Sequence, residues 1–250
     1  GDFEEATFRA TRSIKLSGTN LTNADLSGST LSATAAGDGA DATIDLKGAD
    51  LTNADLSGST LSAEGWLDGE ITFGGANLAD ADLSGSTLSA EGRRDGEITF
   101  DGANLADADL SGSTLSAEGT HDGEITIGGA NLADANLSGS TLSAEGGGYG
   151  EIDFSRANLA DADLSGSTLT AEGEEDGGIY FGGANLADAD LSGSTFTAEG
   201  VRGDGEIIFN GADLADADLS GSNISAEGGK HVSGSKLSAE GGRDGKITFN

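Results

Sequence analysis

Residues 71–90 read ITFGG-ANLAD-ADLSG-STLSA, which are four consecutive steps of five residues. Each step has a large apolar residue at its centre and a smaller residue two positions earlier. A spacing of five drifts around a 3.6-residue helical turn and forms no apolar stripe. Short strands joined by corners fit the spacing, and the Gly, Asp and Ser residues that follow each centre suit such corners. The stretch therefore predicts a coil with four short β-sides. Its apolar centres are Phe73, Leu78, Leu83 and Leu88.

The coil repeats along the chain with a period of 27 residues. A seven-residue insertion, EGRRDGE (91–97), follows the four steps, and the pattern restarts at Ile98. The period lengthens around residues 34–43 and 199–206, and both changes fall in the insertion. Twenty residues of constant length thus predict a closed turn, and the insertion predicts a loop. The centre of the ADLSG step recurs at Leu56, Leu83, Leu110, Leu137, Leu164 and Leu191.

Each insertion has the sequence of a tight turn. The segments EGWLDGE (64–70), EGRRDGE (91–97) and EGTHDGE (118–124) share a Gly after the first Glu and an Asp-Gly pair near the end. Asp-Gly is a strong turn signal between extended flanks. We therefore expect a β-hairpin projecting from one corner of every coil. Its variable tips are either unconstrained solvent-exposed residues or the rim of a fin that contacts a partner.

The steps ANLAD, ADLSG and STLSA resemble the A-(D/N)-L-x-x signature of the pentapeptide-repeat family. The resemblance covers about residues 14–226 and implies an all-β fold, a right-handed four-sided parallel β-helix. The seven-residue insertion departs from the family's plain coil. We expect one β-helical domain over 1–250, with a partial N-terminal coil (1–13), regular coils (14–226) and an irregular C-terminal end (227–250). About eight coils at the spacing of paired strands predict a rod of about 40 Å.

The composition excludes several classes of function. The 250 residues include no Cys, Pro or Met, so disulfides and thiolate metal sites are excluded. No run approaches 18 apolar residues, so no membrane-spanning helix is expected. The 44 acidic and 12 basic residues give a net charge of −32, which argues against nucleic-acid binding. The same charge permits binding to cations or to basic protein surfaces.

Neither end of the coil carries an amphipathic capping helix. After Ala226 the register breaks, and the chain reaches Asn250 in the middle of what would be a coil. Uncapped β-edges favour association, because they present unpaired backbone groups. Two interpretations stay open: a homo-oligomer or polymer formed through the coil ends, or a fragment of a longer array. Candidate subunit-interface residues are Phe3, Phe8, Ile14, Leu16, Val232, Leu237, Ile247 and Phe249.

Acidic residues recur at outward positions of every coil. Stacked carboxylates about 5 Å apart repel one another and favour protons or counter-ions. Hard oxygen ligands suit Ca²⁺, which makes calcium a possible cofactor. The alternative is a solvated acidic face that keeps the rod soluble. Candidate cation ligands are Glu64, Glu91, Glu118, Glu145, Glu172, Asp82 and Asp109.

A second outward pattern pairs Thr with Ser or Thr two residues later, as in Thr87/Ser89 and Thr114/Ser116. Such a flat ladder resembles the ice-binding faces of some antifreeze β-helices. The alternative is an ordinary exposed face made of strand-favouring residues.

No catalytic or cofactor-binding set stands out in the sequence. The two histidines are His121, at a predicted hairpin tip, and His231, near the irregular end. Neither has the spacing of a catalytic triad or of a metal site. We therefore expect no enzyme.

Three functional hypotheses remain. The first is a structural protein, extracellular or at the cell surface, whose subunits stack head to tail into a filament. The second follows from the family resemblance, because some pentapeptide-repeat proteins resemble DNA and bind a topoisomerase. The third is an ice- or cation-binding surface module.

Overall fold

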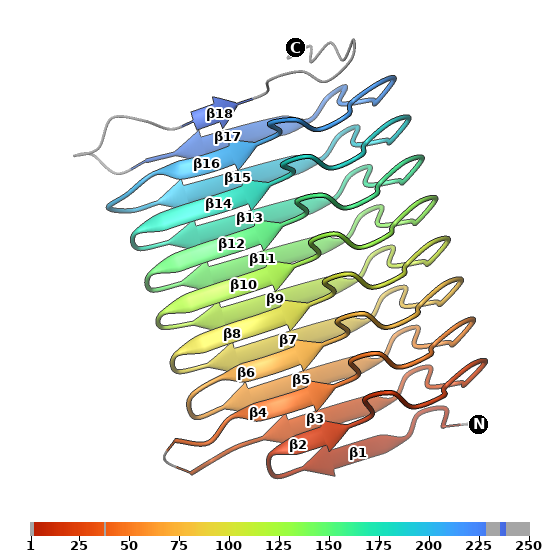
Figure 1. The fold of residues 1–250 in the computed structure, drawn as a ribbon. Helices are drawn as coiled ribbons and strands as arrows, with labels where there is room; N and C mark the ends of the chain where they lie inside the picture. The colour runs from red at the N-terminus through yellow and green to blue at the C-terminus, as the bar shows by residue number, and fades with distance from the viewer. Residues whose placement is uncertain (1–2, 38, 229–235, 239–250) are drawn as a thin grey trace.

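The computed structural model describes residues 3–37, 39–228 and 236–238. These residues form an all-β solenoid without a helix, in two nine-stranded parallel sheets that face each other (Figure 1). The prediction of a parallel β-solenoid is therefore confirmed. The first sheet consists of β1 (Thr7–Ala10), β3 (Thr30–Thr34), β5 (Thr60–Gly65), β7 (Thr87–Gly92), β9 (Thr114–Gly119), β11 (Thr141–Gly146), β13 (Thr168–Gly173), β15 (Thr195–Gly200) and β17 (Asn223–Glu227). The second consists of β2 (Ser13–Lys15), β4 (Ala42–Asp45), β6 (Gly69–Thr72), β8 (Asp95–Thr99), β10 (Asp122–Thr126), β12 (Tyr149–Asp153), β14 (Asp176–Tyr180), β16 (Gly205–Ile208) and β18 (Lys236–Ser238).

Each strand pairs with the strand at the same place in the adjacent coil. The register preserves the 27-residue period from β5 to β15 in the first sheet and from β4 to β14 in the second, whereas the pairs at the two ends have other offsets. On β7 and β9, for example, Leu88 lies opposite Leu115, and Glu91 lies opposite Glu118. Identical residues therefore stack in columns along the rod. An inward position in one coil is inward in all of them, which explains how one short template specifies the whole fold.

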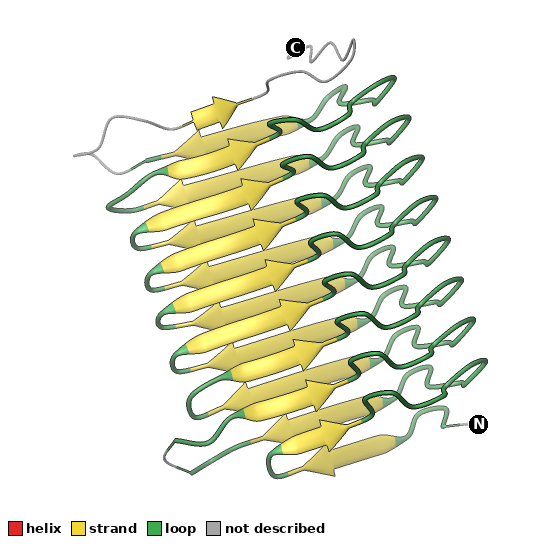
Figure 2. Cartoon of the chain, in the orientation of Figure 1, coloured by secondary structure: helices red, strands yellow, loops and turns green. Residues whose placement is uncertain are grey.

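The pentapeptide corners form β-turns where the sequence predicts them. The N–H groups of Ala76, Ala81 and Ser86 donate to the carbonyl oxygens three residues earlier, at 2.8, 3.0 and 3.1 Å. Between the corners lie single parallel bridges, such as Asn77 with Asn104. These steps form the stacked loops at one side of Figure 2. The four-sided outline and the right-handed winding stay predictions.

The insertion does not form the separate β-hairpin that we expected. Its two halves belong to different sheets: residues 91–92 extend β7, and residues 95–97 begin β8. Each half pairs with the neighbouring coils, β7 with β5 and β9 and β8 with β6 and β10. The backbone N–H and C=O groups of both halves find hydrogen-bond partners in the adjacent coils, so the two halves do not need to pair with each other. The insertion therefore widens both sheets, and its tips form the tight turns opposite the pentapeptide loops (Figure 2).

The two sheets converge towards these tips, because the inward side chains become smaller. Along β7 the inward residues are Leu88, Ala90 and Gly92, and β8 begins with the inward Gly96. A Cβ atom on Gly96 would lie 2.6 Å from the carbonyl oxygen of Ala90 and would also meet the backbone of Glu118. No side chain fits between backbones this close. The Gly after Glu and the Gly after Asp thus allow the sheets to touch.

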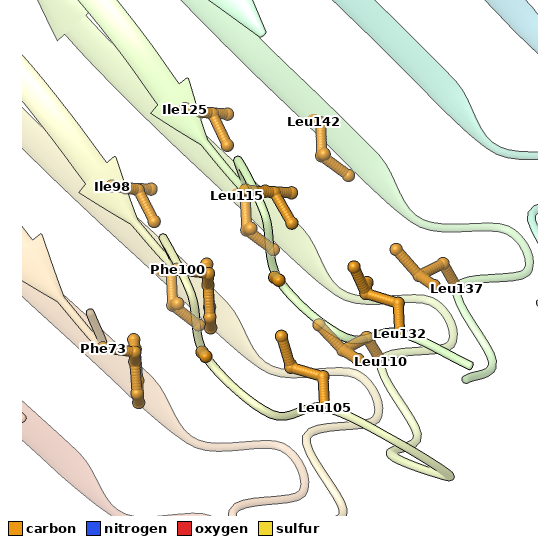
Figure 3. Packing of buried hydrophobic residues seen from close by; sticks show 14 of the residues in the cluster. Phe73, Ile98, Phe100, Leu105, Leu110, Leu115, Ile125, Leu132, Leu137 and Leu142 are labelled. Carbon is orange, nitrogen blue, oxygen red and sulfur yellow. The ribbon is translucent and has the colours of Figure 1, made fainter. Parts of the chain in front are cut away.

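Columns of Leu, Ala, Ile and Phe fill the wide part of each coil (Figure 3). Phe73 and Phe100 stack with ring centroids 4.7 Å apart, and Phe154 and Phe181 stack at 5.0 Å. Ile127 interrupts this phenylalanine column. A cavity of about 10 Å³ lies beside it, lined by Phe100, Leu132 and Ser140 among others. The smaller isoleucine therefore leaves the core underfilled in one coil.

A column of serines is buried with the apolar residues. Ser86, Ser113 and Ser140 are each 1 % exposed, and their hydroxyl oxygens have no hydrogen-bond partner among the described residues. In contrast, Ser194 Oγ donates to the carbonyl oxygen of Leu164 at 2.6 Å. Unsatisfied buried hydroxyls cost stability. Serine therefore fits this position mainly because its side chain is small enough to lie beside the tightly turned backbone.

Candidate functional surfaces

The outer face of the first sheet carries three parallel rows of polar residues. Thr87, Ser89 and Glu91 on β7 lie in register with Thr114, Ser116 and Glu118 on β9. The predicted Thr-x-Ser ladder and one predicted glutamate row are thus brought together on one face. Ser116 Oγ donates to Glu118 Oε1 at 3.3 Å. The threonine–serine ladder is therefore directly flanked by charge.

The candidate cation ligands fall on two different faces. Glu64, Glu91, Glu118, Glu145 and Glu172 form one row on β5, β7, β9, β11 and β13. Three of them, with Glu174, line a shallow depression of about 430 Å³ beside the tips. Neighbouring glutamates and partial burial raise the pKa of Glu172, with burial the larger cause.

Asp82 and Asp109 belong instead to a pentapeptide corner. Each accepts the N–H of the residue two positions on: Asp82 from Ser84 at 2.8 Å, and Asp109 from Ser111 at 2.9 Å. These aspartates stabilise local turns. Across residues 3–37, 39–228 and 236–238, no three His, Cys, Asp or Glu side chains gather closely enough to hold a metal ion. The calcium hypothesis thus has no ligand set in the described part of the chain.

A row of asparagines at the corners forms a hydrogen-bonded ladder. Asn104 Nδ2 donates to Asn77 Oδ1 at 2.8 Å, and Asn131 Nδ2 donates to Asn104 Oδ1 at 3.0 Å. Each amide uses its oxygen towards one coil and its nitrogen towards the other. The row therefore joins coils to one another along the rod.

A second acidic ladder, which our sequence analysis missed, lies on the outer face of the second sheet. Glu70, Glu97, Glu124 and Glu151 occupy successive strands in register. Burial and the neighbouring carboxylates raise the pKa of Glu124 to about 7, and burial also raises the pKa values of Glu70 and Glu151. The Glu that ends most insertions, as in DGE at 68–70, 95–97 and 122–124, was the available signal. The turn signal predicts that this Glu lies in a projecting hairpin, whereas it lies in a strand of the second sheet.

A tyrosine interrupts this ladder. Gly178 stands where the adjacent coils have Glu151 and Glu206. The ring of Tyr180 lies over Gly178, at a place where any Cβ atom on that glycine would collide with it. Burial, followed by the charges of Glu151 and Glu206, raises the pKa of Tyr180 to about 12. A neutral phenol thus separates two carboxylates.

The tips of the insertions contact one another. Arg94 forms ion pairs with Asp68 of the preceding coil and with Asp95, the latter at 2.9 Å. The Arg93 guanidinium lies 5.2 Å from the centroid of the Trp66 ring. His121 donates its backbone N–H to the Arg94 carbonyl oxygen at 2.8 Å. The variable tips therefore pair within the rod, and His121 lies in this row; His231 lies outside the described residues.

Four interface candidates lie at the N-terminal end. Phe3 and Phe8 are 40 % and 38 % exposed, and their rings meet edge to face with centroids 5.8 Å apart. Ile14 and Leu16 are partly buried and pack against the core. The first coil thus leaves a small apolar patch beside the outer edge of β1.

The other four candidates lie at the C-terminal end. Leu237 belongs to β18, where its backbone pairs opposite Ile207. Val232, Ile247 and Phe249 lie outside the described residues. In the described part of the chain no helix is long and apolar enough to cross a membrane.

Three comparisons place the chain among known proteins. The family model "Pentapeptide repeats" matches in eight copies, over residues 2–34, 44–63 and 150–171. None of the curated proteins matches the sequence.

The comparison with solved structures finds QnrB1 and HetL, both with TM-scores below 0.5. Full-length QnrB1, a plasmid-mediated fluoroquinolone resistance protein, is 16 % identical with a TM-score of 0.32; the match covers 90 % of this chain and 94 % of QnrB1. HetL, involved in heterocyst differentiation regulation in the cyanobacterium Nostoc, is 21 % identical with a TM-score of 0.19, covering 88 % of both chains. The family model thus identifies pentapeptide repeats in this chain, and the coils that contain them stack as parallel β-strands.

Proposed function

We propose that this protein is a non-catalytic structural rod whose copies associate end to end. The observation that carries the proposal is the pairing of β1, which among the described residues has a hydrogen-bonded neighbour, β3, on one side only. An open parallel edge can accept a further strand. Exposed Phe3 and Phe8 lie at this edge and supply apolar surface that a second subunit would cover.

End-to-end contact between unlike ends does not close on itself and generates filaments. We place such a filament outside the cell or at its surface, and antibody labelling of intact source cells tests this location. Sedimentation velocity over a range of protein concentrations tests the association. Rods of increasing length in electron micrographs are the expected result. A single monomeric species at the highest attainable concentration contradicts the proposal.

The second candidate is an acidic mimic of DNA that binds a topoisomerase. It is favoured by the two in-register glutamate rows, one on each sheet. Strand spacing puts successive carboxylates about 4.8 Å apart along the rod. Because the insertions extend the sheets and stack on one another, they do not interrupt these rows. A supercoiling assay separates the two candidates: a mimic inhibits the topoisomerase, whereas a structural rod leaves its activity unchanged.

A further inference from the structure

We propose that β1 of one copy pairs in parallel with β17 of a second copy, with Phe8 opposite Ile224 and Arg9 opposite Ser225. The inference rests on the end-to-end association proposed above and specifies its register. In the part of the chain that the structure describes, β1 and β17 are the two terminal strands of the first sheet (Figure 1). A second copy translated along the rod would present one edge to the other with parallel polarity.

The register follows from the pairing inside the rod. Phe8 lies opposite Leu31 on β3, and Ile224 lies opposite Phe196 on β15. Both residues thus belong to the same inward column of the first sheet. Ala10 and Ala226 occupy the neighbouring inward column in the same way. If the subunits continue the column without a shift, Phe8 of one copy meets Ile224 of the next, because a one-residue slip would turn every inward side chain outward.

At both ends of the first sheet, the inward residues of these columns are only partly buried. Phe8 is 38 % exposed, whereas Phe196 in the same column is fully buried. Ile224 and Ala226 are only partly buried, although they pack against the core. A second copy at the strand spacing would cover Phe8 and Ile224 together, as every internal coil covers its neighbour.

The charges of the two edges are opposite. Residues 6–18, which include β1 and β2, contain Arg9, Arg12 and Lys15 and no acidic residue. All three basic side chains are exposed. Glu227 is exposed on β17 and accepts a hydrogen bond from Ser225 Oγ at 3.3 Å. Placed opposite Ser225, Arg9 would be the diagonal neighbour of Glu227, within reach of a long side chain.

The opposite charges lie at the two edges of the first sheet. The second sheet ends on β18, whose Lys236 pairs with Glu206 through the backbone register. The partner is therefore recognised chiefly along β1 and β17, where a basic edge faces an acidic one. A translated copy supplies both the matching column and the matching charge.

Cross-linking tests this register directly, because the chain has no cysteine of its own. Thr7→Cys and Asn223→Cys, an exposed pair opposite each other in the same register, are made as separate full-length variants that keep Arg9. They are treated with a short thiol-to-thiol cross-linker. We expect covalent dimers when the two variants are mixed, and none from either variant alone. Dimers from Thr7→Cys alone would indicate a head-to-head contact and would overturn the proposal.

Charge reversal supplies a second readout. Arg9→Glu is expected to weaken self-association about tenfold, since it places like charges beside each other. Combining it with Glu227→Arg is expected to restore association. Arg156→Glu, an exposed reversal in the middle of the rod, is the matched control. An equal loss from Arg156→Glu would indicate general electrostatics and contradict the register.

The results also separate this inference from the proposed function. A wild-type protein that stays monomeric removes both. A wild-type protein that associates, with no cross-link in the mixture and no effect of Arg9→Glu, retains the structural rod and overturns only the pairing of β1 with β17.

Discussion

Glu124 on β10 lies directly opposite Glu151 on β12, and both carboxylates are half-buried on the outer face of the second sheet. Burial is the larger cause that raises the pKa of Glu124 to about 7, and the charges of Glu151, Glu97, Asp101 and Asp122 add to it. All of these charges are acidic. The ladder thus holds a carboxyl group that ionises only near neutral pH.

The raised pKa predicts that the rod becomes less stable as the pH rises from about 5 to 8. In the unfolded chain Glu124 ionises near its ordinary pKa of 4.5, whereas in the rod it ionises near 7. The stabilisation is full below the lower value and is lost as the pH passes through the higher one. Glu124→Gln should therefore raise the melting temperature at pH 8 more than at pH 5. Glu145→Gln, exposed on the first sheet, removes the same charge and serves as control. Equal effects of the two variants would assign the change to net charge.

Gly96→Ala should destabilise the rod because the sheets touch at this position. The added Cβ would meet the backbone of Glu118 and Ala90, which cannot give way as a flexible side chain can. Overpacking of this kind costs about 1–3 kcal/mol. Gly74→Ala is the matched control, since its Cβ would meet nothing closer than 3.5 Å. Thermal unfolding followed by circular dichroism measures both, and an unchanged melting temperature for Gly96→Ala would show that the sheets do not approach so closely.

Ile127→Phe should stabilise the rod by completing the phenylalanine column. The flanking coils carry Phe100 and Phe154 at the same position, and a cavity of about 10 Å³ lies beside Ile127. A stacked aromatic pair contributes about 0.5–1.5 kcal/mol beyond its burial. We expect a higher melting temperature, and a lower one for Ile127→Ala, which enlarges the cavity. A decrease for Ile127→Phe would indicate that the coil cannot widen to admit a ring.

Calcium should stabilise the rod no more than its ionic strength explains. Where the structure describes the chain, no three acidic or histidine side chains converge on one point. Any cation screens repulsion among the charges that make up the net −32. Melting temperatures in millimolar CaCl₂ and in NaCl of equal ionic strength should therefore agree. A clear excess with calcium, reversed by EDTA, would reveal a specific site.

Much of the molecule could be predicted from the sequence because its pattern is periodic. The parallel solenoid and the corners after Phe73, Leu78 and Leu83 follow from apolar residues spaced by five. The glutamate row through Glu91 and Glu118 follows from the 27-residue period. The ladder through Glu97 and Glu124 could not be predicted in this way, because the Asp-Gly pair indicates the turn of an isolated hairpin. Turn signals identify where a chain reverses, and they do not identify which neighbour its strands will pair with.

The sequence alone determined that one short template is stacked many times, because a strict period requires equivalent positions to share one environment. The tertiary structure decided what the insertion does. Each half finds its hydrogen-bond partners in the coils above and below, so the insertion becomes part of two sheets. Small inward residues then bring the sheets into contact, and Gly96 reaches the backbone of Ala90 and Glu118. Burial of Glu124 depends on that stacking, and so does its pKa, because neighbouring coils supply both the cover and the charge.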